Sequence, residues 1–377
     1  MADFDLIILQ RCFMYDLFSR IRKACNFLGK PLIFETDDDY LNLPTHNPCY
    51  LALAARELLA KYQEFIEAKK FDEAKMLYPL LEQSRLKGLE QYRNIIRESD
   101  GIVVSTEELK RSLTPYNKNI IVLQNNVDRV FYGKDYDSED QHKYQDANGD
   151  WKIKVPTYQN LFTIPSWCII DPKYKVVKKI PRIGYSCTTS HRGQDFDTIK
   201  KKFFKTIDKY HQDTWSVFLG DDYFYNQQEK KGRKHFIWPT EYDLYVFNLR
   251  NIDVGMAPLE TNIFNMSKSD IKAVEHAMWG TPCVLPNMIT YTRNFVNEET
   301  ALFYDNEEEF GEQLERLIKD EKLRRKLGDN AREYVRENRL ESLHSEKRFN
   351  FYQSMVQSSY NLKVFMPHKE LVNNGCT

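Results

Sequence analysis

The chain has 377 residues, enough for two domains with a large buried core. Its 54 Lys and Arg residues nearly balance 55 Asp and Glu residues, so no overall charge field demands a nucleic-acid partner. The cysteines are scattered singly without a CxxC pair, so neither a disulfide framework nor a cysteine zinc site is indicated. The acidic start MADFDLII and the lack of an apolar run near ~20 residues predict a cytoplasmic protein without a signal peptide or membrane span.

The first half of the chain alternates short apolar runs with amphipathic stretches, which predicts parallel strands and helices. Residues 14–28 have helical periodicity up to Gly29, and Thr106 is an N-cap for another helix. Residues 50–98 predict a helical hairpin that breaks near Phe71–Asp72, with Pro79 kinking or restarting its second arm. The expected strands are Leu6–Leu9, Leu32–Phe34, Gly101–Ser105 and Ile120–Leu123.

An acidic cluster, Asp37, Asp38 and Asp39, follows the second strand. Ligands bind at the carboxyl edge of an open parallel sheet, so this cluster is a candidate site. One interpretation is a divalent metal site, because Asp-x-Asp at a strand end suits a metal held against a diphosphate. The other is a wall of the substrate cleft, which a resemblance described below favours. His46 is then a candidate acid or base, and its alternative is a structural or exposed loop histidine.

Residues 131–180 lack periodicity and predict an elaborated connection between two domains. Basic residues gather at its end and beyond it. A solvated surface is the ordinary interpretation of such runs, and a groove for a polyanion is the alternative. The basic residues are Lys173, Lys175, Lys178, Lys179, Arg182, Lys200, Lys201, Lys202 and Lys205.

The second half predicts six more strands, at Arg182–Ser186, Trp215–Leu219, Phe236–Trp238, Val254–Leu259, Cys283–Leu285 and Ala301–Tyr304. The loop after the first of them offers groups that suit phosphate binding, namely Thr188, Thr189, His191 and Arg192. Its alternative is a surface loop in which Arg192 pairs with Asp195. We expect Trp238 and Tyr242 to pack in the core, with stacking on a nucleobase as the alternative.

Residues 253–286 read as one strand–helix–strand unit. We expect its helix to open near Ser269, with Asp270 in the first turn, and to end at Gly280. Lys268, Lys272 and Glu275 then share a face at the helix start, where cations and the free N–H groups favour an anion. The carboxylate suits a neutral polyol such as ribose, so the pattern favours a nucleotide diphosphate. The alternative is a solvated face with a Lys272–Glu275 ion pair.

This stretch, DVGMAPL followed by FNMSKSDIKAVEHAMWGTPCV, resembles the donor domain of GT-B glycosyltransferases of the group-1, family 4, kind. Four further stretches are similar to other parts of that family: FETDDDYLNLP, VVSTEELKRSLTPYNKNIIVLQNNVD, IGYSCTTSHRGQDFD and FGEQLERLIKDEKLRRKLGDNAREYVREN. One departure is clear. The second Glu of the family's Glu-x7-Glu signature falls on Glu275, whereas the first falls on Ser267, which cannot play the same role toward the sugar.

The resemblance implies an α/β protein of two Rossmann-like domains facing a cleft. We expect an N-terminal acceptor domain at 1–130, with the helical insertion 50–98 and completed by a helix at 345–377. A connection at 131–180 and a donor domain at 181–344 follow. The implied catalytic residues are Lys272, Arg192 and Lys268. Donor-binding residues are Thr188, Thr189, His191, Asn265, Ser269 and Glu275, and acceptor-side residues are Asp38, Asp39 and His46.

The implied reaction moves a hexose or pentose from a nucleoside-diphosphate sugar, such as a UDP-sugar, to a hydroxyl of a saccharide or glycan, with retention. The nucleotide sugar is a co-substrate, and no metal is obligatory. Two alternatives stay open. The basic stretches and the helical hairpin would suit a DNA-modifying glycosyltransferase that acts on a hydroxylated base, and Ser267 would suit a non-catalytic nucleotide-sugar-binding module.

Overall fold

The computed structural model describes residues 3–128, 143–145, 151–153, 180–187, 194–220, 222–228, 233–239 and 241–365. The chain forms two compact units. Unit 1 comprises Met1–Asn125, Thr261–Ser269 and His344–Thr377, and unit 2 comprises Asn126–Glu260 and Asp270–Leu343. None of the helices in the described part of the chain has the length and apolar character needed to cross a membrane.

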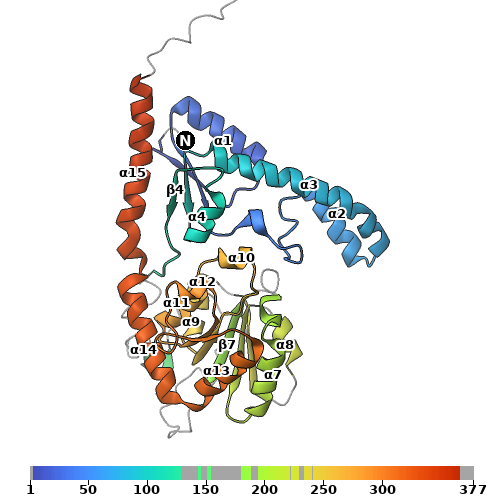
Figure 1. The fold of residues 1–377 in the computed structure, drawn as a ribbon, viewed down its shortest axis with the longest axis vertical. Helices are drawn as coiled ribbons and strands as arrows, with labels where there is room; N and C mark the ends of the chain where they lie inside the picture. Colours follow the sequence, from blue (N-terminus) through green and yellow to red (C-terminus); the bar gives the residue numbers. More distant parts are fainter. Residues whose placement is uncertain are drawn as a thin grey trace, which may run out of the picture. The chain divides into compact units, whose positions relative to one another are not determined.

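Unit 1 is built on four parallel strands in the order β1-β2-β3-β4 (Figure 1). These are β1 (Ile7–Gln10), β2 (Leu32–Thr36), β3 (Gly101–Val104) and β4 (Ile120–Val122). One face packs against α1 (Tyr15–Leu28), α3 (Phe71–Glu98) and α4 (Glu107–Leu113). The other face packs against Phe351, Tyr352 and Met355 of α15 (Glu341–Phe365). The central strands β2 and β3 are buried on both faces, which explains their apolar runs, whereas β1 alternates between half-buried and exposed residues.

The residues that end the unit 1 helices act as predicted. Gly29 follows α1 with a φ of 58°, a left-handed conformation that glycine adopts at low cost. The Thr106 hydroxyl caps α4 by accepting a hydrogen bond from the Leu109 N–H. A helix α2 (Arg56–Glu67) precedes α3 and packs against it, and residues 50–55 before it are not helical. Pro79 lies inside the single helix α3 and does not restart it.

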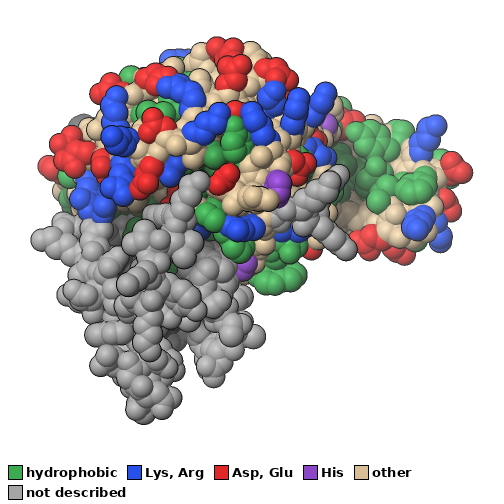
Figure 2. Space-filling view, turned by 90° about the horizontal axis from the view of Figure 1, so that it is seen from below, with side chains coloured by type: hydrophobic (Ala, Val, Ile, Leu, Met, Phe, Trp, Pro, Cys, Tyr) green, Lys and Arg blue, Asp and Glu red, His purple; other side chains and the backbone are tan. Residues whose placement is uncertain are grey.

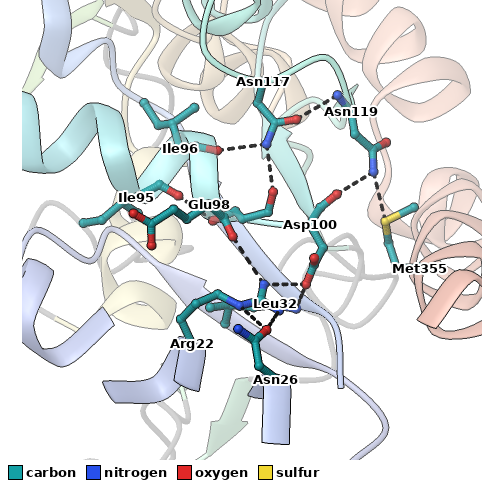
Figure 3. Close-up of polar contacts among 11 residues, drawn as sticks. Arg22, Asn26, Leu32, Ile95, Ile96, Glu98, Asp100, Asn117, Asn119 and Met355 are labelled. Carbon is teal, nitrogen blue, oxygen red and sulfur yellow. Dashed lines mark hydrogen bonds and ion pairs between the residues drawn. The ribbon is translucent and has the colours of Figure 1, made fainter. Parts of the chain in front are cut away.

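A polar network fixes the amino ends of β2 and β3 in unit 1 (Figure 3). Asp100 accepts hydrogen bonds from the Arg22 guanidinium at 2.6 Å and from the Leu32 N–H at 2.7 Å. The Asn117 amide donates to two carbonyl oxygens, of Ile96 at 2.8 Å and Ser99 at 2.9 Å. These bonds satisfy backbone groups where α3 ends and β3 begins. The network lies at the edge opposite to the acidic cluster, so its role is structural.

Unit 2 is built on six parallel strands in the order β12-β11-β10-β7-β8-β9. Read from β9, the order is third, second, first, fourth, fifth, sixth, which is the order of a Rossmann sheet. The strands are β7 (Arg182–Cys187), β8 (Trp215–Gly220), β9 (Arg233–Ile237), β10 (Val254–Met256), β11 (Cys283–Pro286) and β12 (Leu302–Tyr304). The predicted α/β class with two parallel sheets is therefore confirmed.

The helices of unit 2 cover both faces of this sheet (Figure 1). Buried residues of α7 (Lys200–Lys209) and α13 (Glu307–Lys319) pack on one face. α9 (Tyr242–Leu249) packs on the other, where Leu249 contacts Val217 and Leu219 of β8. α11 (Ile271–Met278) packs against α14 (Glu321–Asn338). Strands β5 (Lys143–Gln145) and β6 (Trp151–Ile153) form an antiparallel pair. Almost all of the remaining residues of the predicted connection at 131–180 lie outside the described residues.

Two glycines set the distance between α11 and α14. Gly280 follows α11 with a φ of 72°, as predicted for a glycine that ends the helix. Gly328 of α14 lies so close that a Cβ atom there would be 2.0 Å from the Gly280 carbonyl oxygen. Because no side chain fits between the two backbones, α14 holds the end of α11 directly.

Candidate functional site

The switch point of the unit 2 sheet lies between β7 and β10. The chain runs from β7 to β8 on one side and from β10 to β11 on the other, so the connections diverge and leave a crevice at the carboxyl ends. The Ala257 carbonyl after β10 accepts a hydrogen bond from the Tyr291 hydroxyl at 2.8 Å. The Glu260 N–H donates to Asp195 at 2.9 Å. This is the edge at which ligands bind in open α/β sheets.

Four side chains form a polar cluster at this edge: Ser186, Tyr245, Lys272 and Glu275. Ser186 lies near the end of β7, Tyr245 comes from α9, and the other two come from α11. The Tyr245 hydroxyl lies 2.8 Å from Glu275 Oε2, 2.8 Å from Lys272 Nζ and 3.2 Å from Ser186 Oγ. Lys272 Nζ also lies 3.1 Å from Glu275 Oε2. One tyrosine hydroxyl therefore joins the cation and the carboxylate.

The carboxylate of Glu275 is almost fully buried, with 3 % of its side chain exposed, whereas 25 % of Lys272 is exposed. A buried ion pair is stable only when hydrogen bonds satisfy its remaining groups, and Tyr245 supplies one of them. Glu275 Oε1 has a longer contact, 3.4 Å to the Tyr242 hydroxyl. The ammonium also lies 4.4 Å from the centre of the Tyr245 ring, a favourable cation–π position. The cluster offers a cation for an anion and a carboxylate oxygen for hydroxyl donors.

The first turn of α11 is anchored by a buried ion pair. Asp270 precedes the helix, and both of its oxygens bind the Arg339 guanidinium, at 2.7 and 2.8 Å. The two side chains are 3 % and 1 % exposed. Asn294 donates to the same carboxylate, and Arg339 Nε donates to Asn126. A bidentate pair in this setting fixes the start of the helix that carries Lys272 and Glu275.

The helix opens later than predicted, since α11 begins at Ile271 rather than near Ser269. Lys268 and Ser269 belong to a separate stretch, residues 261–269, which is part of unit 1 and which we call the crossing segment. Lys268 therefore does not share a face of α11 with Lys272 and Glu275. Asn265 lies in the short helix α10 (Ile263–Met266) of the same segment.

The crossing segment is held at the carboxyl ends of the unit 1 strands. The Thr106 hydroxyl donates to the Ser267 carbonyl oxygen at 2.7 Å, and the Asn125 amide donates to the Ser269 hydroxyl at 3.0 Å. The Ser267 hydroxyl donates to Asp39 Oδ2 at 3.3 Å. Lys268 Nζ lies 4.5 Å from the centre of the Phe264 ring and is 7 % exposed. Residues that follow three of the four strands, β2, β3 and β4, thus each contribute a contact.

The acidic cluster of unit 1 separates into different environments. Asp37 pairs with Arg11, whereas Asp39 is fully buried and accepts hydrogen bonds from Asn42 and Ser267. Burial raises the pKa of Asp39 above its ordinary value, and these hydrogen bonds oppose the rise. Asp38 is half-buried and His46 is exposed. Among the described residues, no three metal-ligating side chains gather as a metal site.

Comparison with known proteins identifies the fold. Residues 231–345, which include Tyr245, Lys272 and Glu275, match the family model described as "Glycosyl transferase-like". None of the curated protein sequences is significantly similar to the chain. Several solved structures share this arrangement of two parallel sheets, and one of them is a glycosyltransferase of Rickettsia africae. The fold is GT-B.

Three GT-B structures illustrate the likeness. HepE of Anabaena, solved with UDP-glucose, has a TM-score of 0.53 at 10 % identity, over 97 % of this chain and 80 % of that one. A glycosyltransferase of Rickettsia africae has a TM-score of 0.50 at 14 % identity, over 93 % and 98 %. Sucrose-phosphate synthase of Thermosynechococcus elongatus has a TM-score of 0.50 at 13 % identity, over 95 % and 97 %. The chain therefore has a GT-B fold, as predicted.

Some predicted residues of the GT-B site lie outside the described residues, namely Thr188, Thr189, His191 and Arg192. The expectation that Trp238 and Tyr242 pack in the core is wrong, because they are 61 % and 43 % exposed. They follow β9 and begin α9, at the carboxyl side of the sheet. Their exposure leaves the nucleobase alternative standing.

Sequence reasoning did not identify Tyr245, the residue at the centre of the polar cluster. Tyr245 lies in an apolar stretch, YDLYVFNL, which gives no sign that one of its tyrosines faces α11. The ion pair of Asp270 and Arg339 joins residues that are far apart in the chain, so spacing gives no sign of it either. The sequence also suggested, as the alternative to a nucleotide site, an ion pair between Lys272 and Glu275 on a solvated face. The ion pair is present. It is mostly buried and joined to two further groups, so it is not a solvated surface pair.

Proposed function

We propose that this chain transfers a sugar from a nucleoside-diphosphate sugar to a hydroxyl group of a saccharide or glycan. The observation that carries the proposal is the cluster of Lys272, Glu275 and Tyr245 at the switch point of a Rossmann sheet. It offers one cation for the diphosphate and one buried carboxylate for ribose hydroxyls. The family model covers these residues, and HepE was solved with UDP-glucose, which supports UDP as the first nucleotide to test.

The proposed chemistry needs no protein nucleophile. The bond between the anomeric carbon and the diphosphate oxygen breaks, and the acceptor oxygen forms a bond on the same face, which retains the configuration. The proton of the acceptor hydroxyl passes to the departing diphosphate. The anomeric carbon gains oxocarbenium character while negative charge grows on the diphosphate, so cations placed there lower the barrier. Lys272 is our first candidate for this role, with Lys268 and Arg192 as further candidates.

The other roles follow from the same proposal. Glu275 accepts hydrogen bonds from the ribose, and an exposed ring of Trp238 or Tyr242 stacks on the base. Thr188, Thr189, His191, Asn265 and Ser269 are further proposed donor contacts. Asp38, Asp39 and His46 are proposed on the acceptor side, where Asp39 is held by Ser267 of the crossing segment.

We infer a saccharide rather than DNA as the acceptor because two lysines of the basic stretches are paired with carboxylates. Lys200 pairs with Asp197, and Lys202 pairs with Glu308. Among the described residues on the face drawn in Figure 2, Lys and Arg side chains are interspersed with Asp and Glu. A DNA-binding groove gains its affinity from many unpaired cations along the phosphates.

The test is turnover of UDP-, GDP-, ADP- and dTDP-sugars with a panel of saccharide acceptors, followed by mass spectrometry. We expect one donor to be consumed with formation of a glycosylated product, and Lys272→Ala to reduce turnover by roughly 100-fold or more. Lys319→Ala, at an exposed pair on α13, is the control that leaves turnover unchanged. Tight nucleotide binding without transfer or hydrolysis would instead identify a nucleotide-sugar-binding module. The absence of nucleotide binding would refute the proposal.

A further inference from the structure

The Tyr245 hydroxyl contacts three polar groups from two other elements of unit 2, β7 and α11. They are Glu275 Oε2 and Lys272 Nζ, both at 2.8 Å, and Ser186 Oγ at 3.2 Å. A tyrosine hydroxyl carries one proton and can accept two hydrogen bonds. Each of these three places is therefore taken by one neighbour, and the hydroxyl is fully used.

The chemistry of the neighbours fixes the direction of every bond. A carboxylate only accepts, so the Tyr245 proton points to Glu275. An ammonium only donates, so Lys272 gives a proton to the Tyr245 oxygen. Ser186 must then donate as well, because the only proton of Tyr245 is already given. The network has one arrangement of protons, with Glu275 as its final acceptor.

This arrangement determines what Lys272 and Glu275 can offer to a ligand. The ammonium has three protons and uses two of them, one toward Tyr245 and one toward Glu275 Oε2. No acceptor for the third proton lies among the described residues, so this proton can meet an anion. Glu275 Oε2 receives two donors, whereas the described part of the chain gives Oε1 only the 3.4 Å contact from Tyr242. Oε1 is therefore the oxygen that can accept hydroxyl protons from a ligand.

We propose that Tyr245 is the positioning residue of the nucleotide site, an inference that rests on the proposed function. Its hydroxyl holds the ammonium that meets the diphosphate and the carboxylate that meets the ribose, so it couples the recognition of both groups. Without it, Lys272 keeps a single acceptor and the ammonium moves fully onto Glu275. The cation is then drawn away from the phosphate, and the carboxylate is neutralised for the ribose.

The test is Tyr245→Phe, which keeps the ring beneath Lys272 and removes only the hydroxyl. Binding of UDP, GDP and ADP, each with its 2′-deoxy counterpart, is measured by calorimetry, and the pair that wild type binds best is used. We expect the variant to bind the ribonucleotide roughly 10–100-fold more weakly, as for loss of a hydrogen bond to a charged group. We also expect it to lose most of the preference for ribose over deoxyribose.

Tyr210→Phe is the matched control. The Tyr210 hydroxyl also donates to a carboxylate, Glu315, at 3.0 Å, and Lys209 and Lys319 lie near its ring. It follows α7, at the amino edge of the same sheet, so it shares the chemistry of Tyr245 without the location. We expect nucleotide affinity within twofold of wild type, and a melting temperature lowered about as much as by Tyr245→Phe.

A double-mutant cycle shows whether Tyr245 acts through Glu275. In a Glu275→Gln background we expect Tyr245→Phe to weaken binding by less than about threefold, because the charged acceptor is already gone. A merely structural tyrosine would give the same loss in both backgrounds, and that result would overturn the inference. If Tyr245→Phe fails to fold, Ser186→Ala replaces it. That variant removes the bond that orients the Tyr245 hydroxyl, and we expect a loss of several-fold.

The outcomes separate the inference from the proposed function. Nucleotide binding by wild type, with affinity and ribose preference unchanged in Tyr245→Phe, would overturn the role of Tyr245 and leave the proposed function intact. Unchanged affinity in Ser186→Ala, if that variant is needed, has the same meaning. If wild type binds none of the nucleotides, the proposed function fails, and the inference fails with it.

Discussion

Replacing Asp270 by Asn tests how the site helix is held. The change removes the negative charge from a buried ion pair while keeping the shape of the side chain. The Arg339 guanidinium, 1 % exposed, then loses the counter-charge that Asp270 supplies, while Asn126, Tyr334 and the new amide remain as polar neighbours. An uncompensated buried charge is the reason that breaking such a pair is costly.

The expected loss is about 3–5 kcal/mol in the free energy of unfolding, the usual cost of removing one partner of a buried pair. In a domain of about 150–250 residues, each kcal/mol lowers the melting temperature by about 2–4 °C. We therefore expect a decrease of about 6–20 °C in Asp270→Asn, measured by differential scanning calorimetry. The nucleotide affinity should fall as well, because α11 starts at the next residue.

Two variants complete this test. Glu321→Gln removes the same charge from an exposed pair with Arg325, whose side chains are 53 % and 75 % exposed, and should cost less than about 1 kcal/mol. The double variant Asp270→Leu with Arg339→Met replaces both charges by apolar groups and should recover most of the stability. A loss in Asp270→Asn no larger than that in Glu321→Gln would refute the reasoning.

Three further predictions concern stability. Burial, with a contribution from the charge of Lys272, lowers the pKa of His276 to about 3, so this imidazole is neutral in the folded protein, and acid favours the unfolded chain. The free energy of unfolding should fall by up to about 1.4 kcal/mol per pH unit from pH ~6.5 down to pH ~3, and His276→Leu should remove this part, as measured by urea unfolding across pH. Gly328→Ala places a methyl group 2.0 Å from the Gly280 oxygen and should destabilise by about 1–3 kcal/mol in urea. Asn117→Ala strands two backbone carbonyls (Figure 3) and should cost about 1–3 kcal/mol by thermal unfolding.

Each of these has a result that contradicts it. If the free energy of unfolding falls equally steeply with decreasing pH in wild type and in His276→Leu, the imidazole is protonated in the folded state. Gly311→Ala is the control for the glycine, because the three atoms nearest to its methyl would belong to the Lys202 side chain rather than to backbone, and an equal loss in the two variants would argue against the backbone contact. Asn338→Ala removes one exposed bond to a backbone carbonyl, so Asn117→Ala must cost more than it does.

The sequence predicted the strands well because the central strands of both sheets are buried on both faces. Under that condition each strand is an apolar run, and its position can be read directly. Two strands show the limit. β10 ends at Met256 rather than Leu259, since Pro258 has no N–H to donate and the Ala257 carbonyl bonds Tyr291 instead. β9 is an edge strand, so polar Arg233 and Lys234 belong to it without an apolar signal.

The site could be predicted only where it lies within one helix. Lys272 and Glu275 are three residues apart, so helical geometry brings them together in any fold. Tyr245 joins them only because α9 packs beside α11, which no local pattern encodes. Lys268 shows the opposite error. Its closeness to Lys272 in sequence suggested one shared helix face. However, α11 begins only at Ile271, so Lys268 lies before this helix, in the crossing segment.

The backbone pairing beside Arg339 has a consequence for protein engineering. Val127 donates to the Arg339 carbonyl at 3.0 Å, and its own carbonyl accepts from the Glu341 N–H at 3.0 Å, so a short strip of residues before β5 completes unit 2. A recombinant fragment that started at residue 181 would omit this strip and expose the backbone that it covers. One that starts at Asn126 keeps the strip, and with it the amide that meets the buried guanidinium.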